Sequence, residues 1–170
     1  MTEQLYLKEL NMEDAQKEFA FIRELPADEN GFTNSNYGVD EKTFMEETLP
    51  KLIRFSKGEG LPQGYVPETN YCLWLGEEIV GLFRIRHYLN DFLREGAGHI
   101  GYGIKKEYRG KGYATKGLAL TIEKAKAIIP EDEIYLSVHK ENIASLKAQL
   151  KNGAYIHHED EKEYYTRIKK

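Results

Sequence analysis

The segment from Gly98 to Thr115, GHIGYGIKKEYRGKGYAT, most constrains what this chain can form. An apolar stretch runs into a short turn around Gly110 and Gly112, and a long helical pattern follows directly. Glycines allow a tight turn and a close approach of backbone N–H groups to an anion, and the first turn of a helix adds unpaired donors. We therefore predict a phosphate-binding turn, positively charged at 109 and 111, built from Arg109, Gly110, Lys111, Gly112, Tyr113, Ala114 and Thr115.

Two common phosphate-binding motifs do not fit this turn. A P-loop requires G-x-x-x-x-G-K followed by Ser or Thr, and the sequence contains no such pattern. The dinucleotide-binding pattern G-x-G-x-x-G also fails, because its third glycine position holds Lys106 when counted from Gly101 and Thr115 when counted from Gly110. The turn therefore needs another explanation.

The hexapeptide from Arg109 to Ala114 fits the pattern [QR]-x-x-G-x-[GA] of the GNAT superfamily, the acyl-CoA-dependent N-acyltransferases. Further along, ENIASLKAQLKNGAY has Asn142, Ser145 and Gly153 where that family has its N-x-x-[AS] helix start and the glycine before its last strands. The chain thus resembles this superfamily, and in pattern it is most similar to the subgroup of ribosomal-protein and polyamine acetyltransferases.

The resemblance implies an α/β (α+β) fold with a mixed, mostly antiparallel central sheet of about six to seven strands and about four flanking helices. Two central strands, from His99 to Ile104 and from Ile134 to Val138, are expected to diverge and leave a V-shaped cleft. In such proteins the acetyl-CoA pantetheine pairs with the first of these strands, and its pyrophosphate binds the glycine turn. The residues that this implies for acetyl-CoA, besides those of the turn, are Tyr102, Gly103, Ile104, Asn142 and Ser145.

The catalytic residues are harder to assign. The family commonly has an acid, often tyrosine, seven residues after the motif asparagine, and this chain has Gln149 there. Ser145, at the start of the same helix, is therefore our candidate for protonating the departing thiolate, with a plain helix-start role as the alternative. His99 stands where related enzymes often have glutamate and is our candidate base, although a histidine packed away from the cleft would explain it equally well.

The function expected from the resemblance is direct transfer of an acetyl group from acetyl-CoA to an amine acceptor, either a small molecule or a polypeptide. The alternative from another class is a noncatalytic acyl-CoA-binding or sensory module, which the missing tyrosine at Gln149 favours. The acceptor and the acyl chain are open. Dimers are common in the family, and the sequence leaves a homodimer open.

Composition excludes several other classes. A length of 170 residues suits one domain over 1–170, and the net charge of −4 argues against nucleic-acid binding. The sequence has neither an apolar run long enough to span a membrane nor a secretory signal pattern, and the single Cys72 has no partner for a disulfide, so we expect a cytoplasmic protein. We expect no metal site, because the neighbouring His157 and His158 should point to opposite faces of a strand.

Hydrophobic periodicity and breakers predict the order of the elements. Pro50 should split a helical pattern over 41–56 near Leu49, and the glycine- and proline-rich stretch 58–67 is a candidate substrate loop. The helix after Asn142 should turn Ile143, Leu146 and Leu150 inward and end at Gly153. Strands are expected over 4–8, 71–75, 79–87, 98–104, 134–138, 155–158 and 163–168, with helices after residue 11 and over 113–129.

Overall fold

The computed structural model describes residues 4–29 and 31–170. Its strands are β1 (Leu5–Glu9), β2 (Asp28–Glu29), β3 (Phe32–Thr33), β4 (Glu68–Leu75), β5 (Glu78–Arg86), β6 (Ile100–Ile104), β7 (Glu133–His139), β8 (Tyr155–Glu159) and β9 (Glu163–Lys169). Its α-helices are α1 (Ala15–Glu24), α2 (Glu41–Thr43), α3 (Leu49–Ser56), α4 (Asp91–Glu95), α5 (Tyr113–Ile128) and α6 (Ile143–Lys151). A short 3-10 turn, Lys106–Tyr108, leads from β6 toward α5.

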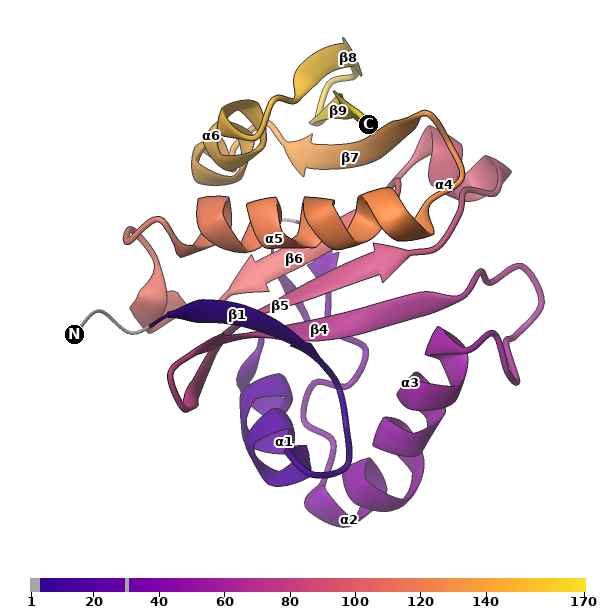
Figure 1. Cartoon of the computed structure of the whole chain (residues 1–170), viewed down its shortest axis with the longest axis vertical. Helices are drawn as coiled ribbons and strands as arrows, with labels where there is room; N and C mark the ends of the chain where they lie inside the picture. Colours follow the sequence, from indigo (N-terminus) through magenta and orange to yellow (C-terminus); the bar gives the residue numbers. More distant parts are fainter. Residues whose placement is uncertain (1–3, 30) are drawn as a thin grey trace.

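Two antiparallel sheets form the centre of the fold. The first has the strand order β1-β4-β5-β6 and the second has the order β7-β9-β8, so β9 lies between the two strands that precede it. β6 and β7 point the same way and meet at one end, where the His99 amide donates to the Tyr135 carbonyl at 2.7 Å (Figure 1). β6 belongs to the first sheet and β7 to the second, so the two strands separate toward their opposite ends. The predicted mixed, mostly antiparallel arrangement with a cleft between two central strands is therefore confirmed.

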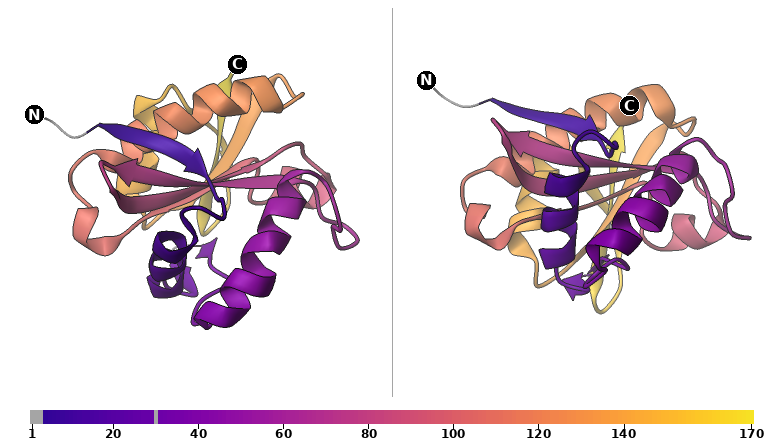
Figure 2. Two further views of the ribbon diagram at one scale, coloured as in Figure 1. Left: turned by 60° about the horizontal axis from the view of Figure 1, so that its bottom comes forward. Right: turned by 90° about the horizontal axis from the view of Figure 1, so that it is seen from below.

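Helices cover both faces of the first sheet, with α5 on one face and α1 and α3 on the other (Figure 2). Under α5, Leu118, Ile122 and Ala125 are buried in a core that includes Phe83. The helix lies very close to the sheet at Gly117, where an added Cβ would be 2.5 Å from the Phe83 ring. This packing fixes the direction in which the start of α5 points.

The helical pattern over 41–56 is continuous rather than broken. A π-helical turn, Phe44–Thr48, joins α2 to α3, and Pro50 lies in the first turn of α3. Proline has no N–H to donate and its ring disturbs the preceding turn, so a local widening of the helix accommodates it without a break. The irregularity predicted near Leu49 is present, but it takes the form of this wide turn.

The prediction that Ile143, Leu146 and Leu150 form the inward face of α6 is wrong. Ile143 is 60% exposed and Leu150 is 45% exposed, whereas Ala148 and Gln149 are buried. α6 packs beside α5, and its Asn152 side chain donates to the Thr115 carbonyl at 3.1 Å. The inward side of α6 is therefore partly polar, because it faces α5 and, at the start of the helix, the cavity described below. The end of the helix is as predicted, since Gly153 follows the C-cap with φ at 89°.

No helix in the described ranges is long and apolar enough to cross a membrane.

Candidate functional site

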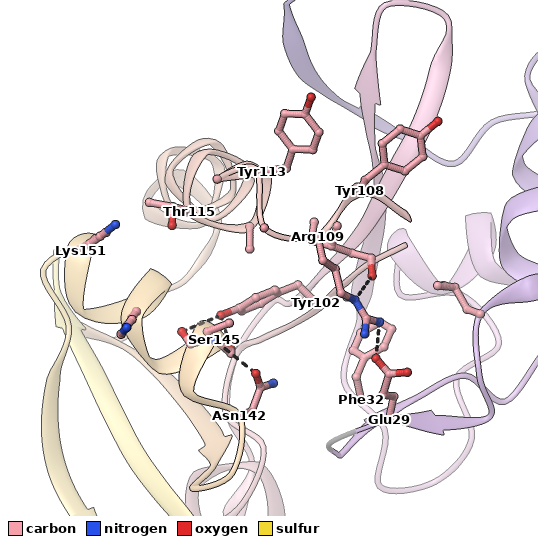
Figure 3. A pocket seen from close by; sticks show the side chains of 18 of the residues that line it. Glu29, Phe32, Tyr102, Tyr108, Arg109, Tyr113, Thr115, Asn142, Ser145 and Lys151 are labelled. Atoms are coloured by element: carbon pink, nitrogen blue, oxygen red, sulfur yellow. Dashed lines mark hydrogen bonds and ion pairs between the residues drawn. The ribbon is translucent and has the colours of Figure 1, made fainter. Parts of the chain in front are cut away.

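A cavity of about 320 Å³ opens where the end of β6, the first turns of α5 and α6, and the segment after α1 converge (Figure 3). It contains nearly all of the site residues predicted from the sequence. The predicted residues that line it are Tyr102, Gly103, Ile104, Arg109, Gly110, Gly112, Tyr113, Ala114, Thr115, Asn142 and Ser145.

The glycine turn has the geometry of an anion site. Gly110 and Gly112 have φ values of 78° and 81°, in the left-handed region that side chains disfavour. Gly112 is the N-cap residue of α5, and no side chain caps that helix start in the described structure. The first amides of a helix have no partner within the helix and lie at its positive dipole end. The amides of Tyr113, Ala114 and Thr115 are therefore available to an anion, whereas the Lys116 amide already donates to the Gly112 carbonyl.

The two cations of the turn differ in position. The Arg109 guanidinium donates through Nε to the Ile104 carbonyl at 2.9 Å and forms an ion pair with Glu29, which also lines the cavity. Lys111 is not among the lining residues, and its Nζ lies 5.8 Å from the centre of the Tyr108 ring. Arg109 thus contributes charge at the cavity wall, and Lys111 contributes charge beside it.

One edge of β6 faces the cavity. Lys105 donates its amide to the Val80 carbonyl of β5 at 2.9 Å, and backbone groups of successive residues in an antiparallel strand face opposite edges. The amide and carbonyl of Tyr102 therefore face the side away from β5, toward the cleft. On one face of the sheet Phe32 covers β6, because a Cβ on Gly103 would lie 3.2 Å from its ring.

Two hydroxyl groups meet across the cleft. The Tyr102 hydroxyl lies 2.5 Å from Ser145 Oγ and also donates to the Ser145 carbonyl at 3.3 Å. Stacking on Phe83 at 5.2 Å orients the tyrosine ring, and burial raises the pKa of the Tyr102 phenol. Asn142 fixes the start of α6, since its side chain accepts from the Ser145 amide at 3.2 Å. Figure 3 shows Tyr102 reaching from β6 toward Ser145.

His99 lies elsewhere, just before β6, where that strand meets β7. Its side chain is fully buried, and its two ring nitrogens are 2.9 Å from the Tyr135 amide and 2.9 Å from Glu131 Oε1. The amide donates to Nδ1, so Nε2 carries the proton toward the carboxylate. Burial lowers the pKa of the imidazole, although Glu131 opposes that shift. His99 is not among the cavity-lining residues.

Gln149 is also occupied within the fold. Its side chain is buried, and its Oε1 accepts a hydrogen bond from Thr166 Oγ1 of β9 at 2.6 Å.

Several residues that line the cavity were not predicted from the sequence. Lys147 and Lys151 are one helical turn apart on α6, so their spacing was a readable signal, whereas nothing in the sequence pointed to Leu25, Pro26, Glu29, Phe32 and Ala144. Tyr108 also lines the cavity and directly precedes the glycine turn.

The described residues contain no group of three or more His, Cys, Asp or Glu side chains that could hold a metal ion. The expectation that His157 and His158 point apart is wrong, because their Nδ1 atoms lie 2.8 Å from each other. A shift in the pairing of β8 with β9 between Ile156 and His158 explains this, since an extra residue in a strand interrupts the alternation of faces.

Comparison with known proteins identifies the class to which this fold and site belong. A family model described as acetyltransferase (GNAT) domain matches residues 4–155. The chain therefore belongs to the GNAT acetyltransferase family. A search of curated protein sequences found no match to the chain.

Solved structures share the fold at low sequence identity. The acetyltransferase of GNAT family from Streptococcus pneumoniae is 22% identical with a TM-score of 0.61, and the match covers 96% of this chain and 97% of that one. For the ribosomal-protein-S5-alanine acetyltransferase from Vibrio fischeri the identity is 17%, the TM-score 0.65 and the coverage 99% and 94%. For Campylobacter jejuni N-acetyltransferase PseH in complex with acetyl coenzyme A these values are 16%, 0.59, 98% and 99%.

Proposed function

We propose that this protein is an N-acetyltransferase that passes the acetyl group of acetyl-CoA directly to an amine. The observation that carries this proposal is the cavity in which an open edge of β6 leads to the uncapped start of α5. An extended amide chain can pair with a strand edge, and a pyrophosphate can bind helix-start amides, so one cavity offers both halves of a CoA site. The PseH complex with acetyl coenzyme A, which shares the fold, supports the same choice of donor.

In this proposal the pantetheine pairs with Tyr102, Gly103 and Ile104, and the pyrophosphate takes the amides from Gly110 to Thr115. Asn142 and Ser145 form the far wall of the cavity. Lys147 and Lys151 line the same cavity and offer positive charge to the remaining phosphate of CoA. Arg109 would exchange its ion pair with Glu29 for a phosphate oxygen when the ligand binds.

The acceptor must lose a proton before its nitrogen attacks the thioester. A lysine-like amine with a pKa near 10.4 is only about 0.04% neutral at pH 7, whereas about a tenth of an α-amino group with a pKa near 8 is neutral. None of the described cavity-lining residues is a histidine, and the one carboxylate among them, Glu29, is paired with Arg109. His99 is held by the backbone and Glu131. We therefore favour acceptors whose amine has a low pKa, such as an α-amino group.

Calorimetric titration with acetyl-CoA, with adenosine diphosphate as the control for unspecific phosphate binding, tests the donor site. Micromolar binding that is selective for acetyl-CoA is expected, and an absence of binding at millimolar ligand would remove the basis of the proposal. A second assay measures CoA release in the presence of a panel of α-amino and side-chain amines. Release that depends on an amine supports an enzyme, whereas binding without any release supports the alternative of an acyl-CoA-binding or sensory module.

A further inference from the structure

Tyr102 of β6 and Ser145 of α6 are joined by a hydrogen bond between their side-chain hydroxyls. Among the described residues that line the cavity, this is the one side-chain hydrogen bond that connects β6 to α6. The two hydroxyls are 2.5 Å apart, and either oxygen can be the donor. Since Tyr102 also donates to the Ser145 carbonyl at 3.3 Å, the serine proton is free to point at the tyrosine oxygen. The pair therefore forms a short chain of exchangeable protons at the cavity wall.

We propose that the Tyr102 hydroxyl is the proton donor to the departing CoA thiolate, with Ser145 as the relay that restores its proton. This inference rests on the proposed function. In the transfer step the bond from the amine nitrogen to the acetyl carbon forms and the carbon–sulfur bond breaks. The electron pair of the broken bond goes to sulfur. Sulfur then takes the Tyr102 proton, Ser145 Oγ passes its own proton to Tyr102, and solvent reprotonates the serine. The proton lost by the amine balances the one gained by sulfur.

Two structural facts favour Tyr102 as the proton donor, and a third sets it apart from Tyr108. Its ring stacks on Phe83 at 5.2 Å, so the hydroxyl is held in one place. Burial raises the pKa of the Tyr102 phenol, so the group retains its proton at neutral pH. Tyr108, by contrast, donates its hydroxyl to Glu78. A proton donor must be protonated and held in place, and Tyr102 meets both conditions.

Position 149 of α6, where related enzymes often have a tyrosine acid, cannot supply one in this chain. Gln149 carries no acidic proton, and its Oε1 is taken by Thr166 Oγ1 at 2.6 Å. The tyrosine reaches nearly the same place from the opposite wall of the cleft, since its hydroxyl bonds Ser145, one helical turn before Gln149. The acid is thus supplied by the strand rather than by the helix.

The test measures the thiol pKa of CoA bound to the protein, by the ultraviolet absorbance of the thiolate, with the complex of desulfo-CoA as the blank. A hydrogen bond to the thiolate stabilises its charged form, so loss of that bond should raise the thiol pKa by about one unit or more. Tyr102→Phe and Ser145→Ala are therefore both expected to raise it. Tyr71→Phe is the matched control, because Tyr71 is a buried tyrosine of the same core whose hydroxyl lies outside the cavity lining.

The outcomes separate this inference from the proposed function. If the unaltered protein does not bind CoA, the proposed function fails and the inference fails with it. If CoA binds and neither Tyr102→Phe nor Ser145→Ala moves the thiol pKa, the inference alone is overturned. Where an acceptor amine is in hand, Tyr102→Phe should lower kcat about 100-fold with little change in KM for acetyl-CoA and should abolish the loss of activity at high pH. An unchanged kcat would overturn the inference.

Discussion

The fully buried His99 and the partly exposed Glu131 form a hydrogen bond of 2.9 Å at the closed end of the cleft. The same carboxylate oxygen accepts the Leu89 amide at 3.0 Å, and His99 Nδ1 accepts the Tyr135 amide at 2.9 Å. One imidazole therefore ties β6 to β7 and to the segment before α4. The divergence of the two strands starts from this fixed point, so His99 contributes to the cavity by positioning its walls.

The first prediction concerns the role of His99. His99→Ala should lower the free energy of unfolding by about 3 kcal/mol, because it leaves a cavity and removes one partner of the part-buried Glu131 carboxylate and the partner of the Tyr135 amide. Urea denaturation measures this loss. The pH dependence of kcat in the folded variant should stay that of the unaltered protein. A stable variant with an altered pH profile would instead support His99 as the base.

His99 also predicts a sensitivity to acid. Its pKa is lowered in the folded state, so the unfolded chain binds the proton more readily. The stability that the neutral imidazole contributes is present above its usual pKa near 6.5 and is lost as the pH falls through the lower folded value. His99→Gln should therefore show a smaller decline in the urea midpoint between pH 7 and pH 5 than the unaltered protein.

The buried Glu18 predicts the opposite pH dependence of stability, a loss as the pH rises. Its side chain is buried in α1, where it accepts the Asn11 amide at 3.0 Å, and burial raises its pKa from 4.5 to about 7. Folding therefore favours the protonated form, and stability is lost as the pH rises from 4.5 through 7. The loss is at most about 3 kcal/mol. Glu18→Gln should flatten this part of the stability profile in urea titrations, and an unchanged slope would contradict the assignment.

The glycine turn can be tested with a matched pair of substitutions. Gly112 and Gly38 have φ values of 81° and 75°, and an added Cβ at either position meets no atom within 4 Å. Each change to alanine should therefore cost a similar 1–2 kcal/mol, roughly, from backbone strain alone. Only Gly112→Ala should weaken acetyl-CoA binding, by about tenfold or more, because it moves the amides at the start of α5. Equal affinities in calorimetry would argue against a phosphate at this turn.

The ion pair of Arg109 and Glu29 predicts an unusual gain of affinity. Both side chains are partly exposed, so the pair is worth at most about 1 kcal/mol. Glu29→Gln should free the guanidinium for a phosphate and tighten acetyl-CoA binding up to about fivefold, with a steeper dependence on salt. Glu24→Gln, which removes one of the two carboxylate partners of Lys105, should leave the affinity unchanged. Weaker binding of Glu29→Gln would show that the carboxylate assists the ligand.

Features that depend only on neighbours along the chain could be predicted from the sequence. The glycine turn before α5, the asparagine cap of α6 and the positive φ of Gly153 follow from residues within a few positions of one another, and the structure contains each of them. Which side of an element faces inward depends on contacts between distant segments. The burial of Gln149 depends on Thr166 of β9, the place of His99 depends on Glu131 and Tyr135, and Phe32 reaches the cleft only because its short strand folds back over β6. A local pattern fixes backbone conformation through short-range sterics and hydrogen bonds, whereas the environment of a side chain is set by segments that approach it only when the whole chain packs.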